Sequence, residues 1–156
     1  MSRILRGAIA GALATAPMTA VMVGAKQFGL MGGMPPEKIT SSVLRRSGIH
    51  PSEGQQDAVA TILHAGFGTA AGAVFGVVAP KRLIARVPVG MAYGAAIWGV
   101  SYMGWVPAFG LMPPADRDRR DRQMVMLAGH LVYGTALALI VGRRDGASST
   151  APEDRP

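Results

Sequence analysis

Four long stretches of the chain contain no Asp, Glu, Lys or Arg, and they divide it into apolar segments and polar connections. They are residues 7–25, 58–80, 87–115 and 123–142. A helix needs about 20 residues to cross a hydrocarbon core of about 30 Å. These stretches are apolar or small on all sides, without the polar face of a soluble helix. The pattern predicts an all-α fold, an integral membrane four-helix bundle with spans at about 5–26, 58–80, 87–112 and 123–142 in a single transmembrane domain, residues 1–144.

Parts of the first half of the sequence return in the second half. Residues 64–70 (HAGFGTA) match residues 130–136 (HLVYGTA), and a Phe-Gly-Leu-Met string precedes each, at 28–31 and 109–112. Each string leads to a proline pair that we interpret as a turn motif of the repeat: Pro35, Pro36, Pro113 and Pro114. We predict two tandem transmembrane hairpins, repeats at about 5–80 and 87–144, which enter the membrane from the same side. Such hairpins form a parallel repeat about a pseudo-twofold axis along the membrane normal.

Small residues at four-residue spacing recur in the first three spans. In lipid, such faces let helix backbones approach closely, and packing contacts replace the missing hydrophobic drive. The glycines that we expect at helix contacts are Gly7, Gly11, Gly68, Gly72, Gly76, Gly90 and Gly94. The first span carries the same glycine spacing as the third, so we expect it to be retained rather than cleaved as a signal peptide.

The connections differ in length and charge. In the long one, residues 26–57, a short amphipathic helix is expected to begin at the proline pair, with Ile39 and Val43 on one face and Gly48 just past its end. It would lie on the membrane surface or be an ordinary solvated helix. The connection at 113–122 contains acids and bases four residues apart, which favour a solvated, self-paired loop. The tail, residues 145–156, is expected to be disordered.

Charge is concentrated between the spans and amounts to +7 overall. In a soluble protein this charge would suggest nucleic acid, whereas here the simpler interpretation is bases that face anionic lipid. We expect the lipid bilayer as a partner, together with a second copy of the chain or another membrane protein, and no nucleic acid. The two sides carry equal numbers of Lys and Arg, but the bases are packed more densely near the termini, which favours a cytoplasmic location for both termini.

The residues that usually carry catalysis are missing from the spans. There is no cysteine, which excludes disulfides, thiolate metal sites and a cysteine nucleophile. All nine acidic residues lie outside the spans, which disfavours a carboxylate-driven proton antiporter. No nucleophile–base arrangement, zinc-protease string or phosphate-binding loop is present. We therefore predict that the protein is not an enzyme and holds no metal or cofactor.

Two histidines lie inside the spans at matching positions of the repeat. They are His64 and His130, and Phe67 and Tyr133 share their helix faces three residues later. Because an ionisable side chain in the bilayer is costly, it is a functional hypothesis by default. His64, His130 and Tyr133 are therefore the candidate intramembrane polar site.

Three interpretations of these histidines stay open. As neutral imidazoles they could hydrogen-bond across helices, to Thr15, Thr19, Ser101 or a carbonyl freed by Pro17. As titrating groups they could relay protons or sense pH, since histidine changes charge near neutrality. As a pair they could bind haem iron or another metal between the second and fourth spans.

Three motifs of the chain can be compared with those of other proteins. They are Gly7-x3-Gly11 followed by residues 14–19 (ATAPMT), then Met34-Pro35-Pro36, and finally His130-x2-Tyr133-Gly134. With these motifs the chain resembles the YagU-like group of small bacterial inner-membrane proteins, across all four spans. The resemblance implies a multi-pass inner-membrane protein without an established molecular activity, and a contribution to acid tolerance. It brings no catalytic residues.

Together these observations predict a non-enzymatic multi-pass protein of the bacterial plasma membrane, an envelope or acid-stress protein. One alternative is a small transporter or proton-conducting protein that uses His64 and His130 at the interface of the repeats. A lesser alternative is a haem-binding electron carrier.

Overall fold

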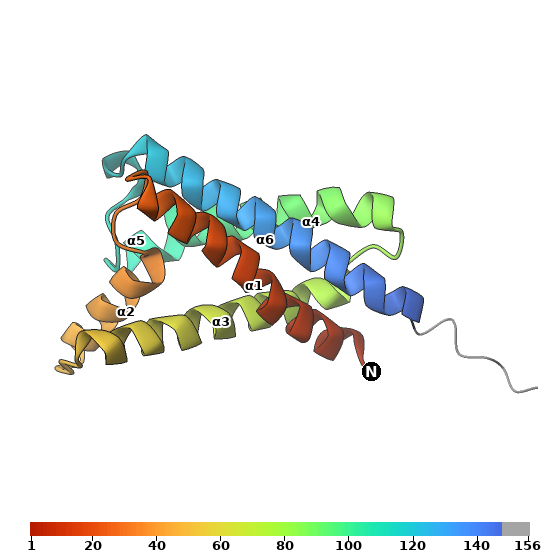
Figure 1. Cartoon of the computed structure of the whole chain (residues 1–156), viewed down its shortest axis with the longest axis horizontal. Helices are drawn as coiled ribbons and strands as arrows, with labels where there is room; N and C mark the ends of the chain where they lie inside the picture. The colour runs from red at the N-terminus through yellow and green to blue at the C-terminus, as the bar shows by residue number, and fades with distance from the viewer. Residues whose placement is uncertain (148–156) are drawn as a thin grey trace, which may run out of the picture.

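A computed structural model shows that the protein is built from long helices (Figure 1). The structure describes residues 1–147, with side chains as far as residue 142, and every regular element among them is helical. Helical segments at residues 3–27, 53–78, 83–108 and 120–142 are long and apolar enough to cross a membrane. This confirms the predicted all-α fold with four spans. The last helix runs to Ala147, and the rest of the predicted disordered tail lies outside the described residues.

The elements follow one another as α1 (Arg3–Gln27), α2 (Pro35–Arg46), α3 (Glu53–Val78), α4 (Leu83–Trp98), η1 (Gly99–Trp105), α5 (Val106–Ala108), η2 (Ala115–Arg117) and α6 (Arg120–Ala147). α3 packs against α1, α4 packs against α6, and α1 packs against α6. The molecule therefore consists of two helix pairs, α1–α3 and α4–α6, joined through their α1 and α6 members (Figure 1). Many large apolar side chains on the outer surface are exposed, as expected for a surface covered by lipid.

Glycines allow α1 and α3 to cross in backbone contact. A Cβ atom at Gly72 would lie 2.5 Å from the Cα atom of Gly11, and one at Gly7 would lie 2.8 Å from the Cα atom of Gly76. A Cβ atom at Gly68 would collide with the Thr15 hydroxyl. Real Cβ atoms do not approach so closely, so side chains larger than hydrogen would force the two helices apart.

The crossing of α4 and α6 is built in the same way. A Cβ atom at Gly90 would lie 2.8 Å from that of Ala138, and one at Gly94 would lie 2.9 Å from the carbonyl carbon of His130. The seven glycines expected at helix contacts all lie at these two crossings. The α4–α6 crossing also holds Gly134 of α6, where a Cβ atom would lie 2.7 Å from the carbonyl carbon of Gly90.

The two Phe-Gly-Leu-Met strings end helices with the same geometry. Gly29 (φ +72°) follows α1 and Gly110 (φ +63°) follows α5, and such left-handed residues favour glycine. The residue after each glycine makes an equivalent backbone hydrogen bond: the Leu30 amide donates to the Ala25 carbonyl, and the Leu111 amide donates to the Val106 carbonyl, both at 3.0 Å. Gly48 (φ +71°) ends α2 likewise.

The two proline pairs differ from each other in structure. Pro35 and Pro36 form the first turn of α2, where the missing N–H groups cost nothing. Pro113 and Pro114 instead precede the single turn η2. Both pairs lie in connections at the same end of the bundle (Figure 1).

The third span is discontinuous, which the sequence pattern did not predict. After Trp98 the chain continues as a π-helical segment, η1, and Gly104 leaves helical geometry altogether (φ −107°, ψ −106°). The physical cause lies three residues further on, because Pro107 has no N–H for the carbonyl of Met103 and its ring crowds that carbonyl. Gly104, which lacks a Cβ atom, takes up the distortion.

The connection at 113–122 is not the solvated loop that its composition favours. Arg122 and Asp118 form an ion pair at 3.6 Å with both side chains nearly buried, and the Tyr102 hydroxyl donates to Asp118 at 2.7 Å. The expected spacing of acid and base is present, but tertiary packing covers it. The other pair in this connection, Arg119 with Asp121, is exposed at 3.2 Å.

Candidate intramembrane cavity

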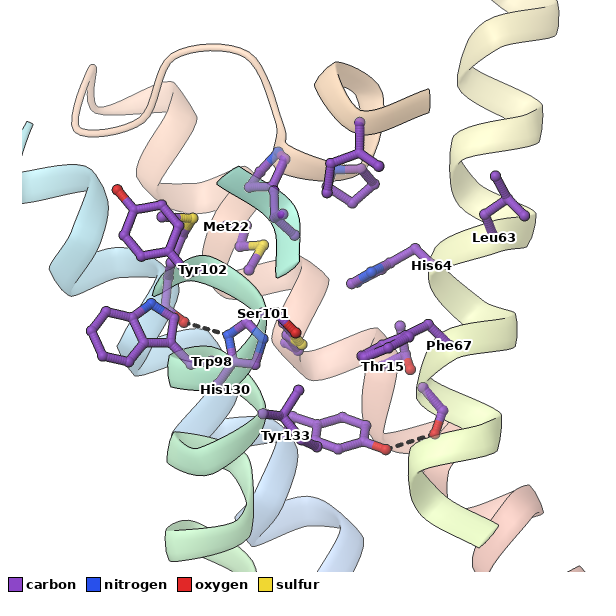
Figure 2. Close-up of a pocket in the computed structure, with 18 of the residues that line it drawn as sticks. Thr15, Met22, Leu63, His64, Phe67, Trp98, Ser101, Tyr102, His130 and Tyr133 are labelled. Atoms are coloured by element: carbon purple, nitrogen blue, oxygen red, sulfur yellow. Dashed lines mark hydrogen bonds between the residues drawn. The ribbon is translucent and has the colours of Figure 1, made fainter. Parts of the chain in front are cut away.

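A cavity of about 310 Å³ lies between α3 on one side and α4, η1 and α6 on the other. α1 contributes its back wall through Thr15, Met18 and Met22, and the start of α2 covers it at the connection end. Figure 2 shows the side chains of α3 pointing across this space toward those of the opposite helices. The walls are largely apolar, as in most small-molecule sites.

The two predicted histidines both line this cavity, one from each helix pair. His64 points from α3 into the space, and His130 lies on the opposite side, on α6 (Figure 2). The hydrogen bond of His130 runs within its own helix, from Nδ1 to the Met126 carbonyl at 2.7 Å. Because a carbonyl only accepts, this bond places the proton on Nδ1 and leaves Nε2 of a neutral His130 as an acceptor. The Nε2 atom of His64 is buried, and no residue that the structure describes is its hydrogen-bond partner.

Tyrosine hydroxyls close the cavity on the side away from α2. Tyr133 of α6 donates to the Gly68 carbonyl of α3 at 2.6 Å (Figure 2). Tyr93 of α4 donates to the Ala71 carbonyl, also on α3, at 2.8 Å. Both accepting carbonyls lie within α3, and each can accept this second hydrogen bond besides its helical one, since a carbonyl oxygen has two lone pairs. These bonds tie α3 to the other helix pair, and from there toward α2 the helix α3 diverges from that pair (Figure 1).

Aromatic side chains dominate the remaining surface of the cavity. Trp98 and Tyr102 stack with ring centroids 5.8 Å apart, and Phe67 meets Trp105 at 6.5 Å across the gap between α3 and η1. The indole Nε1 of Trp98 is buried, and it has no acceptor within the described part of the chain. Indole nitrogen can only donate, so an unsatisfied donor lies in the wall formed by α4.

The residues that the sequence singled out form part of the cavity wall, and tertiary packing brings in the others. Phe67 and Tyr133 share the face of their histidines, as predicted, and both line the cavity. His130 bonds within its own helix and the His64 Nε2 bonds no described residue, so these atoms make none of the interhelical hydrogen bonds that one interpretation expected. Trp98 and Tyr102 were not predicted, because an aromatic residue in a span is usually packing or an interfacial anchor.

The α2 helix also has a role that its sequence did not specify. It packs against α3 instead of lying free, and Ile39 and Thr40 line the cavity while Val43 stays exposed. Arg46 donates to the carbonyls of Phe109 (2.6 Å) and Gly110 (3.0 Å), which fastens α2 to the end of the third span.

Replacing Tyr133 by phenylalanine should weaken the joint between the helix pairs. The change deletes the bond to Gly68 while keeping the buried ring, and intramembrane hydrogen bonds are worth roughly 0.5–2 kcal/mol. We expect a lower thermal unfolding temperature in detergent. The control is Thr135→Val, which removes a hydroxyl bonded only within α6, to the Leu131 carbonyl. Equal effects of the two variants would contradict a special role for the Tyr133 bond.

Four helices that are long and apolar enough to cross a membrane, with a cavity between them, suggest a multi-span α-helical membrane protein. Within that class, the chain belongs to the DUF1440 family, described as a protein of unknown function, whose profile matches residues 35–139. The matched region contains every cavity residue except the three on α1. No curated protein and no solved structure matches the chain.

Proposed function

We propose that the protein is a non-enzymatic, multi-pass protein of the bacterial plasma membrane that works as a small transporter. Its substrate would bind in the cavity, with His64 and His130 as the polar contacts. The observation that carries this proposal is that the two intramembrane histidines, one from each helix pair, line one cavity. Side chains that served packing alone would have no need to converge on an open space.

The broken third span supports the same function. Ser101, Tyr102 and Trp105 of the π-helical segment line the cavity. Non-helical backbone at membrane depth is tolerated where it is buried in protein or lines a cavity, and discontinuous helices form the substrate sites of many transporters. The position of the break therefore favours a binding site over a purely structural bundle.

Several expectations from the sequence belong to this proposal. Both termini would lie in the cytoplasm, the two helix pairs would be the halves of a parallel repeat, and lipid would be the constant partner. The YagU-like resemblance adds a role in acid stress. Two histidines in the cavity support that role, because a change in their charge would alter what the cavity binds.

The absence of cysteine from the sequence allows a direct test with single cysteines. Ser101→Cys places a thiol in the cavity, and its neighbour Val100, which is exposed on the outer surface, provides the matched control Val100→Cys. In liposomes, a small membrane-impermeant thiosulfonate should label Ser101→Cys and leave Val100→Cys unlabelled, because lipid covers the control position.

A transporter must open its site to each side in turn, so reagent added inside or outside should label Ser101→Cys in both cases. Replacing His64 and His130 by glutamine should change the ratio between the labelling rate with reagent inside and the labelling rate with reagent outside. If neither side labels Ser101→Cys, the cavity opens to water on neither side of the membrane and the transport proposal is wrong.

A further inference from the structure

The mouth of the cavity faces the bilayer rather than an aqueous phase. Leu63, Phe67 and Trp105 line the cavity and are also 56, 46 and 37% exposed on the outer surface. α2 covers the connection end, and the tyrosine bonds to α3 close the opposite end. A molecule that reaches the site by this mouth must therefore be dissolved in lipid.

The composition of the walls selects a flat ring. Both tryptophans of the chain and two of its three tyrosines line the cavity, with Phe67 across the gap. Aromatic side chains favour stacked or edge-on contacts with other rings. A cavity of about 310 Å³ admits a substituted six-membered ring, at the lower end of the usual range for ligand sites.

The polar atoms of the cavity favour a ring that carries oxygen substituents. The Trp98 Nε1 can only donate, and the His64 Nε2 is free to donate. Nε2 of a neutral His130 can only accept, because its Nδ1 is bound to the Met126 carbonyl. Among the described residues no Asp or Glu lines the cavity, so no carboxylate there attracts a cationic ligand. A ligand that satisfies this set accepts a hydrogen bond from His64 at one edge, and at the opposite edge it donates to His130 and accepts from Trp98.

We propose that the cavity binds the head group of a membrane-dissolved prenyl quinone, with preference for its reduced, quinol form. One ring oxygen would accept from His64 on α3, and a hydroxyl at the opposite edge of the ring would donate to His130 and accept from Trp98. The prenyl tail would leave through the mouth at Leu63, Phe67 and Trp105 into the lipid. This inference deepens the transport proposal and rests on it, since it names the substrate class of the same site.

The protein carries its own reporter for this ligand, because its only tryptophans, Trp98 and Trp105, line the cavity. In the detergent-purified full chain, a decyl-substituted benzoquinone should quench their fluorescence saturably. The corresponding quinol should compete with higher affinity than the quinone. Decylbenzene, which has a ring and tail but no oxygen, should not compete.

The variants assign each contact. His64→Phe should weaken quinone binding about tenfold, and Trp98→Phe, which leaves Trp105 as reporter, should weaken it several-fold. His130→Phe should abolish the preference for quinol. Thr69→Val is the matched control on α3, since its hydroxyl bonds only the Ala65 carbonyl of the same helix, and it should bind normally. Only variants that elute and unfold like the natural chain are compared, and the ligand competitions require no substitution at all.

Quenching that rises linearly with quinone and is equal in all variants would mean partitioning into detergent and would overturn the inference. So would equal competition by decylbenzene, which would indicate a site for hydrocarbon chains. Labelling of Ser101→Cys from both sides without quinone binding would reject the ligand and leave the transport proposal standing. Failure of both experiments would reject both.

Discussion

Replacing Gly72 by isoleucine should separate α1 from α3 and remove most of the folded protein. Gly72 lies between Gly7 and Gly11 at the crossing, where even a Cβ atom would be 2.5 Å from the Gly11 Cα atom. The neighbouring atoms are backbone, so no flexible side chain can move aside. Overpacking a well-packed interior typically costs about 1–3 kcal/mol and occasionally more, and we expect the upper end of that range or beyond.

The measurement is the monodisperse fraction in detergent gel filtration, together with the thermal unfolding temperature. Gly66→Ile is the control, because a Cβ atom at Gly66 of the same helix would meet nothing within 4 Å. Both changes alter helix propensity equally, so their difference isolates the crossing. Equal behaviour of the two variants would show that α1 and α3 do not pack in this register.

Replacing Arg86 by leucine should have the second large effect, at the turn between the two helix pairs. Arg86 is only 2% exposed, and its guanidinium donates to the carbonyls of Pro80 (2.7 Å) and Lys81 (2.5 Å). These carbonyls follow the end of α3, so the side chain holds the turn in place from inside. Hydrogen bonds from a charged donor contribute about 1.5–3 kcal/mol each, and we expect a loss of about 3 kcal/mol in total.

Chemical unfolding in detergent would measure this loss. Arg82→Leu removes a charge from the same turn at an exposed position and should leave stability almost unchanged. Arg86→Lys should recover only part of the loss, because an ammonium group lacks the fork that reaches two carbonyls at once. Full recovery by lysine would mean that charge alone, rather than the fork, stabilises the turn.

The parts of the fold that the sequence predicted correctly are those that the physical properties of a bilayer impose on any chain. Four uncharged stretches long enough to cross it became four helical spans, because every backbone polar group in lipid must find its partner within the segment. Glycine spacing marked the two crossings for a similar reason, since close contact is the main attraction between helices in lipid. His64 and His130 were conspicuous because ionisable residues are rare at that depth.

The rest depends on tertiary packing that no local pattern encodes. Proline alone does not predict the break at Gly104, because many membrane helices continue through proline, as α1 does through Pro17. Whether Pro107 breaks its helix depends on whether the neighbouring helices tolerate the distortion. The covered pair of Arg122 and Asp118 looked like a solvated one, because its spacing is the same in either case. The cavity itself arises from the divergence of α3 from the α4–α6 pair, a relation between elements far apart in sequence.

The arrangement of the crossings has a consequence for how the protein assembles in the bilayer. Each glycine crossing lies within one helix pair, α1 with α3 and α4 with α6, and the segment between the pairs is only the short turn held by Arg86. Each pair can therefore complete its tightest contact as soon as its own two spans have been inserted during synthesis. The docking of the finished pairs comes last, and it alone creates the cavity. Until that step, the faces of the helices that later line the cavity would remain exposed to lipid.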